Sequence, residues 1–166
     1  MAARNIIKLG ALEAPRTAFL LCDIQETFRP HVKHFGEVVK VANKMLEAAK
    51  HFKIPVYISE QYPKGLGHTT KDIKVEDAAM VYEKTKFSMY TPELQERLKK
   101  DVPDLASVVL FGIERFQNIG CFVGSSENVL FKLLRDKNHP AFKQISKLSM
   151  TPTPDEFGAK TIKDMS

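Results

Sequence analysis

The chain has 166 residues, a length typical of one domain with a sizeable core. Its hydrophobic content of 43%, with 8 glycines and 9 prolines, indicates a globular protein and excludes fibrous and largely disordered classes. A formal net charge of +5 leaves an anionic substrate or a nucleic acid open as partners. The basic residues are dispersed, however, and the aromatic residues are mostly Phe in apolar runs, which favours a solvated basic face over an RNA surface.

The sequence does not indicate a membrane partner. No apolar run approaches the roughly 20 residues of a membrane-spanning helix. The first ten residues, MAARNIIKLG, lack the apolar core of a secretory signal and the Arg and Ser content of a mitochondrial presequence, so we expect a cytoplasmic protein. The two cysteines, Cys22 and Cys121, form no disulfide framework, and Cys22 is expected to be inert inside a strand.

Strand and helix patterns alternate along the first two thirds of the chain. The apolar run 18–22 predicts a strand covered on both faces, and apolar residues at helical spacing predict a helix over 35–49. A strand over 56–59, an irregular loop over 60–82, a helix from Pro92 with Thr91 as its cap, and a fully buried strand over 107–112 follow. This order predicts parallel βαβ units in a three-layer α/β domain with a mainly parallel sheet.

The alternation of strands and helices is interrupted after Gly112. Residues 113–120 are too few for a full crossover helix and run directly into CFVG at 121–124, before a helix over 127–134 capped by Ser125 or Ser126. Parallel neighbours need a crossover of about a dozen residues or more. The sequence therefore predicts one domain over 1–150 that lacks a crossover unit after Glu114, followed by a flexible tail over 151–166.

Two charged residues are the first candidates for catalysis. Asp23 follows a buried strand, at the sheet edge where open α/β sheets bind ligands, although Asp also caps turns and helices. Lys84 lies in YEKTKFSMY at 82–90, where a lysine beside a buried carboxylate could orient a nucleophile or stabilise a developing anion. A solvated lysine is the alternative, and spacing does not separate Lys84 from Lys86.

Other polar residues give weaker signals. Glu60, Gln61 and Tyr62 are expected to line a pocket mouth, against the alternative of ordinary loop polarity. His31 and His34 have a spacing that can bind metal, but no acidic or Cys partner has matching spacing, so we expect no metal site and no cofactor.

Five segments, taken in order, resemble one family. They are LLCDIQETF, ISEQYPKGLG, EKTKFSM, VVLFGIE, and RFQNIGCFVGSSENVLFKLL with the later HPAFKQISKL. Together they are similar to animal isochorismatase-domain-containing proteins, of the isochorismatase-like cysteine hydrolase superfamily. The D-x-Q motif alone would be weak, but five ordered segments over about 17–148 are specific.

The resemblance implies a Rossmann-like hydrolase of a small polar substrate with an Asp–Lys–Cys triad. Asp23 matches the general base, Lys84 rather than Lys86 matches the lysine, and Gln25 and Phe28 would line the pocket. In this chemistry a thiolate attacks an electrophilic carbon, Asp23 accepts the thiol proton, and the lysine charge lowers the thiol pKa. The related nicotinamidases carry a D-x-H metal signature where this chain has SEQ at 59–61, which argues against zinc and against nicotinamide as substrate.

The sequence departs from the family at the nucleophile. The family's cysteine lies a few residues after GIE, where this chain has RFQNIG and Asn118 stands at about the expected position. RFQNIGCFVGSSE instead resembles a later family segment, in which Cys121 falls on a non-catalytic strand position. We therefore expect about 30 residues or more to be missing between Glu114 and Arg115, through a splice form, a deletion or an omission. Cys121 as a substitute nucleophile is the alternative.

Three functions follow from these observations. The first is a cysteine hydrolase scaffold with little or no hydrolysis in its present form. The second is a non-catalytic binding protein that forms a homo-oligomer. The third is a basic RNA-acting protein such as a ribonuclease, which the charge alone suggests.

Overall fold

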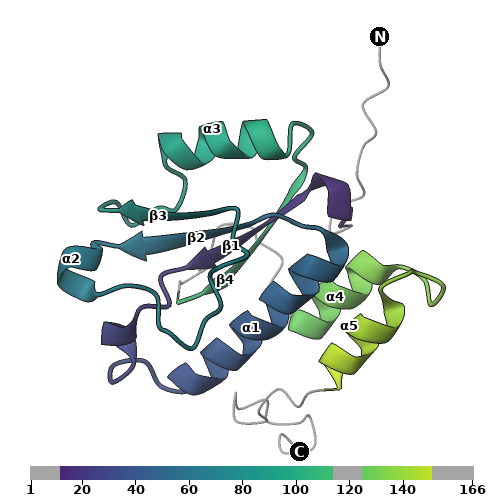
Figure 1. Ribbon diagram of the computed structural model, residues 1–166, viewed down its shortest axis with the longest axis horizontal. Helices are drawn as coiled ribbons and strands as arrows, with labels where there is room; N and C mark the ends of the chain where they lie inside the picture. Colours follow the sequence, from purple (N-terminus) through teal and green to yellow (C-terminus); the bar gives the residue numbers. More distant parts are fainter. Residues whose placement is uncertain (1–11, 114–124, 151–166) are drawn as a thin grey trace, which may run out of the picture.

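Four parallel strands, in the order β3-β2-β1-β4, form the sheet of the computed structural model, which describes residues 12–113 and 125–150 (Figure 1). The strands are β1 (Thr17–Cys22), β2 (Val56–Gln61), β3 (Met80–Lys84) and β4 (Ser107–Gly112). Helix α3 (Pro92–Asp101) covers one face, and α1 (Phe35–Phe52), α4 (Ser126–Leu134) and α5 (Phe142–Ser149) lie on the other (Figure 1). The predicted three-layer α/β class with a parallel sheet is confirmed.

Strand β1 lies at the centre of the core. All six of its residues are buried, as a continuous apolar run predicts for a strand between two layers. Alternate side chains face opposite layers: Phe19 and Leu21 pack in the cluster beneath α1, while Leu20 and Cys22 pack in the cluster beneath α3. This burial fixes the position of the residue that follows the strand.

Side chains cap two of the helices at their N-termini. Thr91 accepts a hydrogen bond from the Leu94 amide at 3.3 Å, and Pro92 occupies the first turn of α3. The Ser125 hydroxyl accepts one from the Asn128 amide at 3.3 Å, so Ser125 rather than Ser126 caps α4. Short 3-10 turns, Ala14–Arg16 and Glu26–Phe28, flank β1.

The predicted irregular loop over 60–82 is wrong at both ends. Strand β2 continues to Gln61, the short helix α2 occupies Pro63–Leu66, and β3 begins at Met80. β3, MVYEK, is an edge strand of the described sheet, and its burial alternates: Tyr82 and Lys84 are buried while Val81 and Glu83 are exposed. The strand ends in two charged residues, so its bounds do not coincide with an apolar run.

The prediction that 107–112 is a fully buried strand is also wrong. None of the residues of β4 is fully buried, and the side chain of Val108 is 46% exposed. The reason is position, because β4 pairs with β1 alone in the described part of the sheet. Its apolar run is typical of a strand with neighbours on both sides.

The end of β4 nevertheless lies tightly against β1. Gly112 pairs with Cys22, has a φ of 126°, and a Cβ at this position would lie 2.3 Å from the Cys22 carbonyl oxygen. Only glycine fits such a close approach at a positive φ. The two strands therefore end side by side immediately before Asp23.

Several expectations fall outside the described residues. These are the discontinuity between Glu114 and Arg115, the roles of Asn118 and Cys121, and the tail over 151–166. Within the described ranges, no helix combines the length and apolar character needed to cross a bilayer.

Candidate active site

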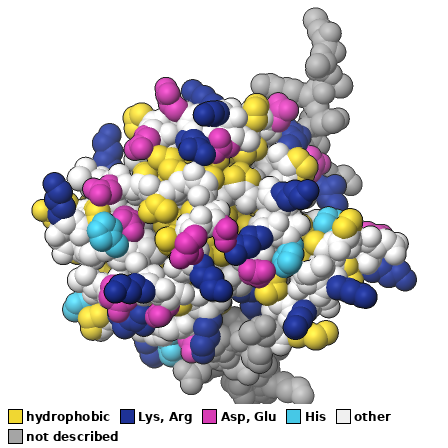
Figure 2. Space-filling model, in the orientation of Figure 1, with side chains coloured by type: hydrophobic (Ala, Val, Ile, Leu, Met, Phe, Trp, Pro, Cys, Tyr) yellow, Lys and Arg dark blue, Asp and Glu magenta, His cyan; other side chains and the backbone are white. Residues whose placement is uncertain are grey.

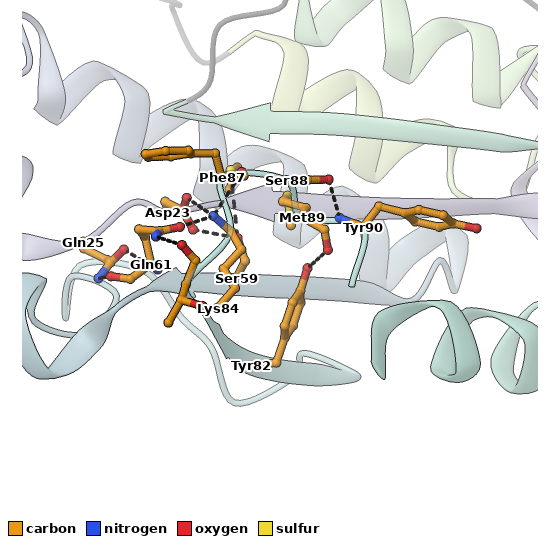
Figure 3. A network of polar contacts seen from close by, with 12 residues as sticks. Asp23, Gln25, Ser59, Gln61, Tyr82, Lys84, Phe87, Ser88, Met89 and Tyr90 are labelled. Atoms are coloured by element: carbon orange, nitrogen blue, oxygen red, sulfur yellow. Dashed lines mark hydrogen bonds and ion pairs between the residues drawn. The ribbon is translucent and has the colours of Figure 1, made fainter. Parts of the chain in front are cut away.

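The carboxyl ends of β1, β2 and β3 bring a buried ion pair together (Figure 3). Lys84 is the last residue of β3, and Asp23 directly follows β1. The Lys84 Nζ lies 2.6 Å from Asp23 Oδ2, and the two side chains are only 1% and 11% exposed. Lys86, which spacing could not exclude, is exposed. Parallel strands that end at one edge thus join two residues that are 61 positions apart.

The backbone at Asp23 turns sharply out of the sheet. Its φ is 49°, in the left-handed region that Asp and Asn enter more readily than other side chains. The Asp23 amide donates to the Ser59 carbonyl at 3.2 Å, and the Asp23 carbonyl accepts from the Gln25 amide at 2.9 Å. Uncommon backbone conformations of this kind cluster at functional sites, where the surrounding structure maintains them.

Ser59 is a site residue that the sequence argument did not identify. Its hydroxyl donates to Asp23 Oδ1 at 2.7 Å, so each carboxylate oxygen has a different partner in the protein. Ser59 precedes Gln61 by two positions on β2, and side chains two apart on a strand share a face. That period is the signal that could have placed both residues beside the ion pair.

The loop after β3 is held against Lys84. The Lys84 ammonium donates to Gln61 Oε1 at 2.7 Å and to the Phe87 carbonyl at 3.4 Å (Figure 3). The Tyr82 hydroxyl donates to the Met89 carbonyl at 2.6 Å. Burial raises the pKa of Tyr82 above its ordinary value, so the hydroxyl keeps the proton that it donates. Phe87 itself is 87% exposed.

Three of the predicted pocket residues lie in different surroundings. Gln25 is fully buried, and its amide contacts backbone groups of Gln61 and Gly67. Phe28 is partly buried and packs against the core beneath α1. Tyr62 is 54% exposed at the start of α2. Contact of these residues with a substrate stays a prediction.

Glu60, another of the five predicted pocket residues, lies on the opposite face of β2 from Ser59 and Gln61. Its Oε1 accepts from the Thr69 amide at 2.7 Å, and its Oε2 lies 2.8 Å from His68 Nδ1. Burial alone would raise the pKa of Glu60, but the Thr69 and His68 hydrogen bonds outweigh it and the pKa is lowered. The same hydrogen bond raises the pKa of His68. This pair fastens the segment after α2 to the end of β2.

The described residues contain a base and a cation, but no accessible thiol. Cys22 is their one cysteine; it is fully buried within β1, with its Sγ 3.9 Å from the Ser59 hydroxyl. In residues 12–113 and 125–150, no group of three or more His, Cys, Asp or Glu side chains could hold a metal ion. The arrangement can accept a proton and stabilise a nearby negative charge.

Comparison with known proteins identifies relatives of the whole described fold. The isochorismatase domain matches residues 17–115, and isochorismatase domain-containing protein 2 of Xenopus laevis is 37% identical over 190 residues, covering 91% of this chain and 92% of the frog protein. The solved structure of the MAR1 ribonuclease of Caenorhabditis elegans has a TM-score of 0.77 and 27% identity, covering 91% of this chain and 98% of that one. The YcaC gene product of Escherichia coli, described as an octameric hydrolase of unknown specificity, shares the fold at a TM-score of 0.54 and 17% identity, over 62% and 52% of the two chains.

The alignment with the frog protein is longer than the part of this chain that it covers. The frog alignment spans 190 positions, whereas 91% of 166 residues is only about 151, so about 40 positions of the alignment face gaps in this chain. The domain match ends at Arg115, one residue beyond the predicted discontinuity. On the strength of the domain match and the frog relative, this chain belongs to the isochorismatase domain family.

Proposed function

We propose that this chain carries the Asp–Lys part of an isochorismatase-like cysteine hydrolase for a small polar substrate. The observation that carries the proposal is the buried contact of 2.6 Å between Lys84 Nζ and Asp23 Oδ2 at the carboxyl edge of the sheet. In this reaction Asp23 accepts the proton of a thiol, and the Lys84 charge favours the thiolate. Ser59 holds the second carboxylate oxygen and so orients the base.

The thiol itself is proposed to belong to a segment that this form of the chain lacks. The total of about 40 alignment positions without a counterpart in this chain and the end of the domain match at Arg115 both support a missing crossover unit. The exposed Val108 of β4 supports it too, because a further strand beside β4 would explain an apolar run at what is otherwise an edge. In this form we expect little or no hydrolysis.

Completing the chain tests the proposal. A segment of the frog protein of about 40 residues, taken from after its position equivalent to Glu114, is inserted between Glu114 and Arg115, and both proteins are assayed on a panel of small amides and esters. We expect turnover only after insertion. In the completed protein, Asp23→Asn should lower the rate by about 10²-fold or more, because it removes the base. Asn also tolerates the left-handed backbone, so the fold should remain.

A matched control and two outcomes make the test decisive. Asp104→Asn changes an exposed carboxylate far from the ion pair along the sequence and should leave the rate unchanged. Turnover by the present chain that survives Asp23→Asn would overturn the triad. A folded, completed protein that hydrolyses no member of the panel would favour the non-catalytic binding function.

A homo-oligomer is the second part of the proposal. The support is the octameric state described for the YcaC gene product, which shares this fold. Sedimentation equilibrium of the present chain measures the assembly directly, and a monomer at all concentrations would contradict it. If assembly is independent of the site, Asp23→Asn should leave the measured mass unchanged.

A ribonuclease activity is the competing function, favoured by the name of the Caenorhabditis relative and by the net charge of +5. On the face shown in Figure 2, however, Lys and Arg side chains are interspersed with Asp and Glu and do not gather into one patch. Incubation with single-stranded RNA at low and high salt, with cleavage and binding both measured, tests the ribonuclease activity. Cleavage, or binding that weakens steeply with salt, would support an RNA function. The absence of both cleavage and binding at low salt would exclude an RNA function.

A further inference from the structure

The glutamine of the D-x-Q motif, Gln25, is inaccessible to solvent. Gln25 is fully buried, and its amide pairs with the backbone of Gln61: Oε1 accepts from the Gln61 amide at 2.7 Å, and Nε2 donates to the Gln61 carbonyl at 3.0 Å. Nε2 also donates to the Gly67 carbonyl. Both hydrogens and the oxygen of this amide are therefore committed to backbone groups. The side chain fixes the position of Gln61 in the way that a neighbouring strand would.

The side chain of Gln61 then points at Lys84 (Figure 3). Its Nε2 donates to the Thr85 carbonyl at 2.9 Å, which requires Oε1 to lie on the other side. Oε1 accepts from Lys84 Nζ at 2.7 Å. Because the Thr85 carbonyl can only accept, it fixes which end of the Gln61 amide carries the nitrogen. The oxygen end therefore faces Lys84 as an acceptor.

The Lys84 ammonium has as many acceptors as it has hydrogens. They are Asp23 Oδ2 at 2.6 Å, Gln61 Oε1 at 2.7 Å and the Phe87 carbonyl at 3.4 Å. An ammonium carries three donors and no acceptor. With all three directed at protein oxygens, none is left in this arrangement for a substrate atom.

We propose that Gln25 and Gln61 are positioning residues that hold Lys84 as a fixed, fully hydrogen-bonded charge. Lys84 then acts on the reaction through its electric field, and neither donates a proton to the substrate nor attacks it as an amine. Gln25 acts at a distance, through the backbone of Gln61. The inference rests on the proposed function only in taking Asp23 and Lys84 as the chemical centre.

Competitive labelling of amines tests the inference without any turnover. The folded present chain is treated with trace acetic anhydride, and modification of Lys84 is measured by peptide mass spectrometry relative to Lys86, an exposed lysine two residues away. We expect Lys84 to react about tenfold more slowly than Lys86 or slower still, since it is buried and hydrogen-bonded. We call the extent of Lys84 modification divided by that of Lys86 the Lys84 ratio. Gln61→Leu should raise this ratio by about fivefold, which is the effect of one hydrogen bond of ordinary strength.

Three further variants separate positioning from a general loss of structure. Gln25→Leu should raise the Lys84 ratio although Gln25 does not touch the lysine. Gln61→Glu keeps an acceptor oxygen of the same reach and should return slow labelling. Gln144→Leu changes an exposed glutamine on α5 and should alter nothing.

Circular dichroism establishes that each variant is folded before labelling. Should Gln25→Leu fail to fold, the Gln61→Leu and Gln61→Glu pair still decides the question. An unchanged Lys84 ratio in folded Gln61→Leu overturns the inference, as does rapid labelling of Lys84 in the unsubstituted chain. Expected labelling with no turnover in the completed protein would instead count against the proposed function and leave the inference standing.

Discussion

Two neighbouring strands of the sheet, β1 and β4, look alike in sequence and differ in structure. β1 and β4 are both continuous apolar runs, yet every residue of β1 is buried and none of β4 is fully buried. β1 has a strand on each side, whereas β4 pairs with β1 alone in the described residues. An apolar run therefore reports the environment for which a strand is suited, and the neighbours actually present decide whether that environment is achieved.

Leucine truncation should break this comparison most strongly. Leu21→Ala removes a fully buried side chain from β1 and should lower the free energy of unfolding by about 2–5 kcal/mol. Leu110→Ala, in partly exposed β4, should cost about half of that or less, because less apolar area is lost from the interior. Urea denaturation measures both. Equal losses would mean that β4 is as well covered as β1.

A partly buried ion pair tests how firmly α4 docks beyond the predicted discontinuity. Lys44 Nζ on α1 lies 2.8 Å from Glu127 Oε1 on α4, and the two side chains are 6% and 28% exposed. Glu127→Ala should cost about 1–3 kcal/mol, because it takes a carboxylate away from a buried ammonium. Urea denaturation again gives the value, with Glu127→Gln as the size-matched control. No change with Glu127→Ala would show that this ion pair does not stabilise the docking of α4 on α1 in solution.

The N-terminal caps of α3 and α4 allow the stability of these two helices to be compared with matched substitutions. Thr91→Ala and Ser125→Ala each remove a hydroxyl that accepts a backbone hydrogen bond, and each should cost its helix about 1 kcal/mol. For α3 we expect a drop in the global free energy of unfolding. For α4 we expect faster amide hydrogen exchange within that helix, with a smaller global loss. Global losses of equal size would argue that both helices unfold with the rest of the domain.

The smallest effect expected is a pH dependence at the end of β2. The Glu60 hydrogen bond raises the pKa of His68 above 6.5, so its stabilising contribution is fully present below about pH 6.5. That contribution is lost as the pH rises through the folded-state pKa. His68→Gln should therefore lower Tm more at pH 6 than at pH 9. The same difference at both pH values, or a larger one at pH 9, would contradict the assignment, and Glu60→Gln serves as the partner variant.

The sequence predicted the fold class and the candidate residue Asp23 for identifiable physical reasons. A continuous apolar run placed β1, and the position of Asp23 after it marked the sheet edge where ligands bind. Spacing alone could not choose Lys84, because β3 is an edge strand whose burial alternates and which ends in charged residues. The resemblance of the segment EKTKFSM to the family supplied that choice.

Other parts of the site depend on contacts that spacing does not encode. The resemblance predicts Gln25 at the pocket lining, and the structure shows in addition that its amide is committed to the backbone of Gln61 and Gly67. Ser59 has no motif around it, and only the two-residue strand period, which places it on the same face as Gln61, points to it. The carbonyls of Thr85 and Phe87 are backbone groups, which any residue type could supply.

The left-handed turn at Asp23 also restricts which sequences can occupy this position. Most substitutions there would both remove the carboxylate and strain the backbone at a φ of 49°, at a cost of about 1–2 kcal/mol. Asn is the replacement that silences the charge while keeping the turn. Under the proposed function, relatives that keep the fold without the reaction should therefore carry Asn, or the side-chain-free Gly, at the position equivalent to Asp23, and a search of genomes for such inactive copies can begin with that single residue.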